Sequence, residues 1–260
     1  MTKPNHPTLF LTIDDFPSAT AQQLLRLLRE RQLPAVLFCV GNLLEKNKEA
    51  AVDAIKQGLI LGNHSFSHKS FSLMTLDACL DDIKRCDNLL HELYDKAGIT
   101  WRYKYFRFPY GDQGDGKRGR LFTRKWFGLT RSKKAAIQKE LENVGYRNPT
   151  TALLQYPGFR KTVGADLDWS WTLDSLDWVL GKKESVFGLR TVDQLVCRLT
   201  SANPFECRGK FPDKDYGLPV GLNEVLLTHD RENGTDALSK IIDACLSAGY
   251  HFTMPEVATR

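Results

Sequence analysis

The chain has 260 residues, of which 42% are hydrophobic, and a formal net charge of +5 at pH 7. This composition is typical of an ordinary globular protein with one sizeable core, and it argues against a disordered chain. The modest positive charge permits anionic partners without requiring nucleic acid. No apolar run approaches the roughly 18 residues of a membrane-spanning helix, so we expect no membrane span.

The N-terminal residues and the cysteines indicate the compartment in which we expect the protein. The opening residues, Met1 to Pro7, lack the apolar segment of a signal peptide. We therefore expect a cytoplasmic protein if this N-terminus is native, and a secreted or periplasmic one if a leader has been removed. The scattered cysteines form no Cys-x-x-Cys pair, which favours buried free thiols over a disulfide or a cysteine metal site. They are Cys39, Cys79, Cys86, Cys197, Cys207 and Cys245.

The first part of the chain alternates between short apolar runs and amphipathic segments. Residues 9–13 predict a strand, and a helical pattern follows from Ser18. Residues 35–40 predict a second buried strand, 50–57 a helix that ends at Gly58, and 59–62 a third strand. Thr75 is positioned to cap a long helix whose apolar positions continue to Leu93.

The alternation continues to the C-terminus. We predict strands at 103–107 and 162–167, a helix at 191–199, a strand at 225–228, a helix at 236–247 and a short strand at 251–252. Alternating strands and helices predict βα units with a largely parallel sheet and right-handed crossovers. Since no repeat or flexible linker interrupts the pattern, we expect one domain over residues 1–260.

Polar side chains follow several of the predicted strands directly. In parallel α/β folds the carboxyl ends of the strands meet at one face, where chemistry collects. Residues far apart in the sequence are therefore expected to meet there. These residues are Asp14, Asp15, His64, His68, Arg107 and His229.

Two of these groups together suggest a metal site. An adjacent aspartate pair such as Asp14-Asp15 often only begins a turn, and a His-x-x-x-His such as His64 to His68 is often only a surface feature. In combination, one carboxylate and two imidazoles suit Zn²⁺ or a similar ion and leave positions open for water and substrate. The second carboxylate is then available to handle a proton. The pattern favours a metal-dependent hydrolase.

Five ordered segments resemble the motifs of the NodB-type polysaccharide deacetylases, carbohydrate esterase family four. The segments are Thr12 to Asp15 with Pro17, His64-Ser65-x-x-His68, Arg107 to Gly111, Asp174 to Trp178, and Leu226 to Asp230. Each is short, but five in this order are specific, and the resemblance extends from about residue 8 to 253. It implies an α/β fold, a distorted (β/α) barrel, here with insertions near 113–160 and 201–222.

The resemblance implies an activity and a ligand set. The activity is metal-dependent removal of an N-acetyl group from an amino sugar of an oligo- or polysaccharide, through attack by a metal-bound water. By motif position Asp15, His64 and His68 would bind one divalent ion, most plausibly Zn²⁺, with Co²⁺ or Ni²⁺ as alternatives. Asp14 would be the general base, and Arg107 would keep it ionised and oriented.

The remaining implied roles concern the leaving group and the acyl pocket. His229 would protonate the departing amine, and Asp177 would stabilise its imidazolium form. The backbone N–H of Tyr110 would stabilise the oxyanion. Trp178 and Leu227 would line the pocket for the acyl methyl group.

Two departures from the family pattern affect these assignments. The family usually has glycine where this chain has Phe16, so we expect a bulky ring near the mouth of the site, where it would narrow the site or stack on a sugar. The fourth motif also has a competitor, because Asp166, Asp168 and Trp171 lie just upstream. We prefer Asp177 with Trp178, since the spacing Asp-x-x-Asp-Trp fits better.

The basic segment 117–139 leaves alternatives open. It contains nine Lys or Arg residues and no acid, with Phe122, Trp126 and Phe127 interspersed. We interpret it as a solvated insertion, or as a contact for an anionic group on an N-acylated amino sugar, and do not expect nucleic acid as the partner. Alternative functions are hydrolysis of another C–N bond, in a formamido sugar or cyclic amide, hydrolysis of an O-acetyl ester, or a non-catalytic saccharide- or nucleic-acid-binding module.

Overall fold

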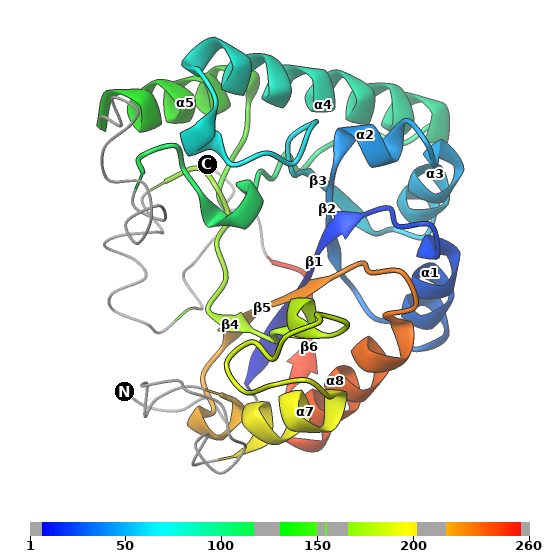
Figure 1. Ribbon diagram of the computed structural model, residues 1–260. Coiled ribbons are helices and arrows are strands. Elements are labelled where there is room, and N and C mark those ends of the chain that lie inside the picture. Colours follow the sequence, from blue (N-terminus) through cyan, green and yellow to red (C-terminus); the bar gives the residue numbers. More distant parts are fainter. Residues whose placement is uncertain (1–6, 117–130, 150–153, 155–165, 202–216, 256–260) are drawn as a thin grey trace.

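The computed structural model describes residues 7–116, 131–149, 154, 166–201 and 217–255. Parallel strands occupy the centre and helices surround them (Figure 1). The strand order is β3-β2-β1-β5-β4, and each neighbouring pair in this order is parallel. The strands are β1 (Thr8–Phe16), β2 (Val36–Cys39), β3 (Ile60–Asn63), β4 (Leu173–Asp174) and β5 (Glu224–His229), with β6 (His251–Phe252) paired to the start of β1.

Two isolated bridges continue the strand array beyond β3. Asn63 pairs with Phe106, and Phe106 pairs with Asp168, both in parallel. Asp168 lies on the segment that leads into β4, so the array returns towards its other edge. The predicted α/β fold, a distorted (β/α) barrel, is confirmed, and its irregular side is the one made of single bridges.

The helices form an arc along the top, right and bottom of Figure 1, in nearly the same order as the strands. The long α4 begins after its cap at Thr75, whose side chain accepts from Ala78 N, and ends at Gly98, which has φ +71°. The helices are α1 (Ala21–Glu30), α2 (Gly41–Leu44), α3 (Lys48–Lys56), α4 (Leu76–Ala97), α5 (Arg131–Val144), α7 (Val192–Thr200) and α8 (Thr235–Ser247). Single 3₁₀ turns are η1 (Phe71–Leu73), η2 (Pro109–Gly111), η5 (Asp177–Val179) and η7 (Leu218–Val220).

Alternation along the strands separates two cores. Leu9, Leu11 and Ile13 of β1 belong to the cluster that contains the buried faces of α1, α3 and α8 and part of that of α4. Phe10 belongs to a second cluster built mainly from strand side chains, which fills the barrel interior. The interior cluster is Phe10, Val36, Phe38, Ile60, Tyr105, Leu154, Trp169 and Val225.

This alternation positions the polar side chains at one end of the barrel. Phe10, Thr12 and Asp14 are alternate positions of β1, so the Asp14 side chain lies on the same interior side as Phe10 and Thr12. His229 stands four residues after Val225 in the same way. Asp14 and His229 are also direct partners in the parallel register of β1 and β5. The carboxyl mouth of the barrel therefore receives both side chains because the period of a strand is two.

Most predicted elements are confirmed within a few residues, and the exceptions lie on the irregular side. Residues 103–107 form only a bridge at Phe106 instead of a strand. In the predicted strand 162–167, residues 162–165 lie outside the described residues. The same holds for half of the predicted insertion 113–160, for most of the predicted insertion 201–222 and for 117–130 of the basic segment, while the remainder of the basic segment begins α5.

The cysteines differ in part from the expectation of free thiols. Cys39, Cys79, Cys86 and Cys245 are free and buried, and burial raises the pKa of the Cys86 thiol. Cys197 is disulfide-bonded, so the prediction is wrong at this position. No helix in the described part of the chain combines the length and apolar character that crossing a membrane requires.

Candidate metal and catalytic centre

A cleft of about 490 Å³ opens at the carboxyl mouth of the barrel. It brings together residues from β1, β5, the loop after β3, η2 and η5. The predicted site residues that line it are Asp14, Asp15, His64, His68, Tyr110, Trp178, Leu227 and His229. The sequence prediction that strand ends would converge is thus met in the structure. Arg107 and Asp177 lie directly behind this lining, while Phe16 does not reach it.

Asp15, His64 and His68 form a compact cluster, which we call the triad. One ligand atom from each of the three lies within 4.8 Å of the others. His68 Nε2 is 3.0 Å and His64 Nε2 is 3.8 Å from Asp15 Oδ1. Asp15 Oδ1 is buried, and within the described chain no donor approaches it with hydrogen-bond geometry. A buried oxygen facing two imidazole nitrogens fits a divalent cation of borderline hardness.

The protonation states of the triad also suit a cation. Burial would raise the pKa of Asp15, but its contact with His68 and the charges of His64 and His68 hold that pKa well below its usual range. Burial lowers the pKa of His64, against the opposing charges of Asp14 and Asp15. An ionised carboxylate and a neutral imidazole are the forms that bind metal.

Hydrogen bonds behind the triad fix the orientation of its members. His64 Nδ1 lies 2.8 Å from the carbonyl oxygen of Arg107, which can only accept, so Nδ1 carries the proton and Nε2 is free to face the cleft. Asp82 Oδ2, on α4, accepts from Phe66 N at 3.1 Å and Ser67 N at 3.0 Å and so holds the loop between the two histidines.

The backbone around the triad is in a rarely populated conformation. Asp15, Ser65, His68 and Tyr110 all have positive φ, between 54° and 64°. Such strain persists only where the surroundings hold it, and it tends to gather at functional sites. Three of these residues, Asp15, His68 and Tyr110, line the cleft, so their positions there come at the cost of local backbone energy.

Asp14 is paired with a buried arginine. Arg107 Nη1 donates to Asp14 Oδ1 at 2.8 Å and to Thr12 Oγ1 at 2.8 Å, and Arg107 Nε donates to Trp169 O at 2.7 Å. The guanidinium lies 4.2 Å from the ring centroid of Phe38. The other oxygen of Asp14, Oδ2, is 3.5 Å from His64 Nε2 and faces the triad.

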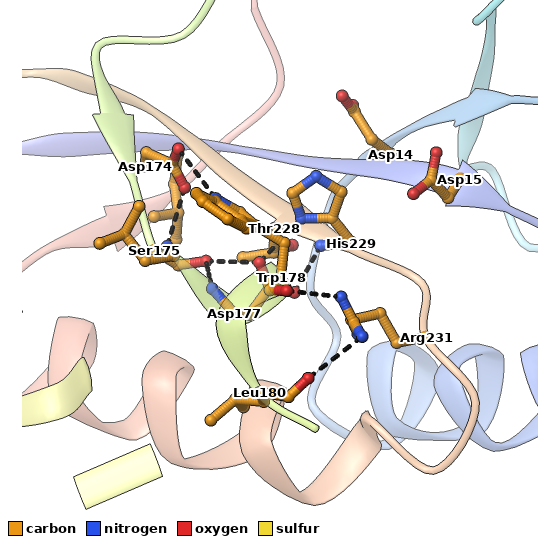
Figure 2. Close-up of polar contacts among 12 residues, drawn as sticks. Asp14, Asp15, Asp174, Ser175, Asp177, Trp178, Leu180, Thr228, His229 and Arg231 are labelled. Atoms are coloured by element: carbon orange, nitrogen blue, oxygen red, sulfur yellow. Dashed lines mark hydrogen bonds and ion pairs between the residues drawn. The ribbon is translucent and has the colours of Figure 1, made fainter. Parts of the chain in front are cut away.

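His229 and Asp177 form a second pair across the cleft (Figure 2). His229 Nδ1 is 2.8 Å from Asp177 Oδ1, and His229 N donates to Asp177 Oδ2 at 2.8 Å. Burial would lower the pKa of His229, but the charge and hydrogen bond of Asp177, with the charges of Asp14 and Asp15, raise that pKa to about 9. His229 is therefore a protonated acid at neutral pH, with Nε2 left to face the cleft.

The competing fourth-motif residues lie elsewhere. Asp168 is buried on the outer side of the strand array and accepts from Gln113 and Gln138. Asp166 pairs with Lys134 at 2.6 Å. Of the competing set Trp171 alone lines the cleft. Among the two choices, Asp177 is the carboxylate in contact with His229.

Phe16 is a correction to the sequence prediction. Its side chain is 0% exposed and belongs to the core beneath the helices, so it neither narrows the mouth nor reaches a sugar. The register of β1 shifts between Ile13 and Phe16, and Asp15 has φ +64°. This irregularity breaks the simple alternation and turns the ring towards the core beneath the helices.

Three further residues at the site escaped the sequence analysis. Asp82 interrupts the apolar face of the helix that begins after Thr75, and a buried acid on such a face was the available signal. Lys182 and Arg231 line the cleft, and no spacing rule marks them because both sit in turns after the motifs. Arg231 Nη1 donates to Trp178 O at 3.0 Å and Nη2 to Leu180 O at 3.2 Å (Figure 2).

Comparison with known proteins agrees with this geometry. The family model for polysaccharide deacetylase matches residues 2–121, which contain the triad, Asp14 and Arg107. This part of the chain is similar to polysaccharide deacetylases. The resemblance stated from the five motifs is thereby confirmed.

Curated relatives match this chain at low identity. YheN of Bacillus subtilis is 23% identical over 249 residues, which cover 96% of this chain and 67% of YheN. The peptidoglycan-N-acetylmuramic acid deacetylase PdaC of the same organism is 28% identical over 119 residues, which cover 45% of this chain and 24% of PdaC. The chain thus spans about two thirds of the length of one relative and about a quarter of the other.

Solved structures share the fold. A family 4 carbohydrate esterase from Streptomyces lividans, in complex with acetate, matches with a TM-score of 0.56 at 21% identity, covering 96% of this chain and 93% of that one. A CE4 family pseudoenzyme from Bacillus anthracis matches with a TM-score of 0.58 at 17% identity, covering 96% and 64%. Because both an esterase and a pseudoenzyme have this fold, activity must be argued from the site.

Proposed function

We propose that the protein is a metal-dependent carbohydrate deacetylase that removes an N-acetyl group from an amino sugar of an oligo- or polysaccharide. One observation carries the proposal. The triad, Asp14 and His229 line a single cleft, with Asp14 and His229 side by side in the register of β1 and β5. Cation binding, proton acceptance and proton donation are thus assigned to different side chains around one point.

Asp15, His64 and His68 would hold the ion, and the donor set favours Zn²⁺, with Co²⁺ or Ni²⁺ as substitutes. An ion bound there would polarise the acyl carbonyl and acidify a water molecule. Asp14 is suited to remain a base because Arg107 engages its Oδ1, which leaves Oδ2 directed at the triad. The backbone N–H of Tyr110 would stabilise the developing oxyanion.

His229 would complete the reaction. As a C–O bond to water forms, Asp14 Oδ2 accepts the proton of that water. As the C–N bond breaks, His229 Nε2 donates a proton to the amide nitrogen, so that acetate and a free amine leave. Asp177 holds the imidazolium in place through Nδ1. Trp178 and Leu227 would enclose the acyl methyl group.

The test is acetate release from N-acetylated chitooligosaccharides by protein stripped of metal and then given Zn²⁺, Co²⁺ or Ni²⁺. We expect release to return with metal, to be lost in Asp15→Ala together with metal binding, and to fall about 10²–10⁴-fold in Asp14→Asn while metal binding remains. Metal content is measured in every sample.

The other outcomes are separable. Tight metal binding without acetate release would move the substrate to formamido sugars or cyclic amides. Failure to bind any of the three metals would contradict the hydrolase assignment and favour a non-catalytic binding module.

A further inference from the structure

A chain of hydrogen bonds between side chains connects the histidine loop, residues 64–68, to the outer helices. Asn63 ends β3 and immediately precedes this loop, Tyr146 lies just after α5, and Asp87 lies on α4. Asn63 Nδ2 donates to Tyr146 Oη at 2.7 Å, and Tyr146 Oη donates to Asp87 Oδ1 at 2.8 Å. Lys104 Nζ ends the chain by donating to Asp87 Oδ1 at 2.9 Å. We call these four residues the relay.

The two ends of the relay determine the direction of every hydrogen bond in it. The ammonium of Lys104 can only donate, and the carboxylate of Asp87 that is paired with it can only accept. The Tyr146 hydroxyl must therefore donate to Asp87. Burial and the nearby charge of Asp87 raise the pKa of Tyr146, which keeps its hydroxyl protonated. Because this hydroxyl has a single proton, it can only accept from Asn63.

The other contacts of Asn63 agree with this orientation of its amide. Asn63 Nδ2 also donates to the carbonyl oxygen of Ile83 at 3.0 Å, and Asn63 Oδ1 accepts from Ser65 N at 2.8 Å. A reversed amide would place two donors face to face at Ser65 and two acceptors face to face at Ile83. Asn63 and Tyr146 are both 0% exposed, so each mismatch would leave a buried polar group unsatisfied. The relay therefore gives Ser65 N an acceptor at one fixed position.

Ser65 links the amide of Asn63 to the second histidine of the triad. Ser65 has φ +64°, a conformation that a residue other than glycine keeps only where its surroundings hold it. Asn63 holds its N–H, and Gly41 N donates to its carbonyl oxygen at 3.0 Å. Ser65 Oγ in turn accepts from His68 N at 3.2 Å, and His68 has φ +54°. The orientation of the Asn63 amide therefore bears on the backbone of His68.

We propose, on the basis of the proposed function, that Asn63 and Tyr146 are positioning residues for the metal centre. They hold the histidine loop in its strained conformation and thereby set the affinity of the triad for a divalent cation. Because Tyr146 follows α5 and Asp87 lies on α4, the packing of these two helices (Figure 1) influences the position of His68. Hydrogen bonds in such a chain polarise one another, so the relay acts as a unit.

Tyr146→Phe is the variant that tests the relay, because it removes the central hydroxyl and keeps the ring. The ring packs against Phe106 with centroids 5.8 Å apart, so the core around it should be retained. Tyr250→Phe is the matched control, since Tyr250 is also buried and its hydroxyl donates to Leu218 O at 3.0 Å. Both variants lose a buried hydroxyl, and thermal unfolding measures how much global stability each one loses.

The first measurement is amide hydrogen exchange at Ser65 and His68 in the metal-free protein. We expect Tyr146→Phe to accelerate exchange at these two amides about 5-fold or more, beyond any change shared by the whole protein, because the Asn63 amide loses its fixed orientation. Tyr250→Phe should show no such local acceleration. Local exchange in Tyr146→Phe that equals that of the wild type would overturn the proposal.

The second measurement is the affinity for Zn²⁺, obtained by titration of the metal-free protein. We expect it to fall about 10-fold in Tyr146→Phe, the lower end of the effect of residues that orient metal ligands, and to stay unchanged in Tyr250→Phe. A double-mutant cycle with Ser65→Ala tests the route, because two residues that act through one path lose less together than the product of their separate fold-changes. Equal losses in Tyr146→Phe and Tyr250→Phe, or independent effects in the cycle, would contradict the relay.

The two measurements separate this proposal from the proposed function. Faster local exchange in Tyr146→Phe of a protein that binds no metal would support the hold on the histidine loop and contradict the proposed function. Zn²⁺ binding and acetate release by the wild type, with exchange and affinity unchanged in Tyr146→Phe, would overturn only the role of the relay.

Discussion

The cleft has two sides that are built in different ways. On the triad side, His64 and His68 follow β3 on one short loop, and backbone amides of that loop are held by Asp82. On the His229 side, His229 and Asp177 are 52 positions apart in the sequence and are joined by a hydrogen bond between their side chains. Hydrogen bonds from Arg231 to backbone carbonyl oxygens hold the same two segments together. The triad geometry is therefore fixed largely by local backbone, whereas the His229 pair depends on tertiary contacts between η5 and β5.

The largest effect should distinguish the chemistry of the two sides. His229→Ala should lower acetate release from an amide about 10²–10⁴-fold while leaving metal binding intact, because the amine leaves poorly without a proton. On 4-nitrophenyl acetate, whose leaving group needs no proton, the loss should be much smaller. Equal losses on both substrates would mean that His229 is not the acid.

A smaller effect should appear when the support of the triad is removed. Asp82→Ala leaves the amides of Phe66 and Ser67 without their acceptor, so the histidine loop should loosen. Loss of such outer support typically lowers metal affinity about 10–100-fold. Titration with Zn²⁺ measures it, and Asp81→Ala, an exposed neighbour on α4, is the control. Unchanged affinity in Asp82→Ala would show that the strand end alone fixes the histidines.

The His229 side should respond to pH. With the pKa of His229 raised to about 9, the ring is protonated below that pH, so kcat/KM should decline on the alkaline side as pH rises through about 9. Asp177→Asn should move this limb towards the ordinary value of about 6.5. The raised pKa also stabilises the fold below about pH 6.5, and that stability is lost as pH rises through about 9. A limb that does not move in Asp177→Asn would assign it to another group.

The smallest effect should come from the packing beneath the triad side. A Cβ at Gly62 would lie 2.8 Å from two ring carbons of Phe38 and 3.1 Å from Tyr105 O. Gly62→Ala should therefore cost about 1–3 kcal/mol of unfolding free energy, measured by denaturant titration. Because Phe38 also supports Arg107, a modest loss of activity should accompany it. Unaltered stability would show that the ring of Phe38 can move aside.

The sequence anticipated the triad side more completely than the His229 side. Asp14, Asp15 and His64 could be placed because each closely follows a short apolar run, and strand ends meet at one face of a parallel fold. Phe16 could not be placed, because the register shift in β1 turns its ring towards the core beneath the helices and leaves no trace in the sequence pattern. Lys182 and Arg231 were missed because their positions depend on how a turn after η5 packs against the end of β5, which is a tertiary contact.

Aromatic side chains occupy much of the barrel interior. Phe38, Tyr105 and Trp169 are buried beneath the cleft, and Arg107 rests on Phe38. Within the residues that the structure describes, these side chains close the floor of the barrel beneath the cleft. Under the proposed function, a sugar chain would lie across the rim with one acyl group in the cleft, and the acetate formed there would leave through the same opening.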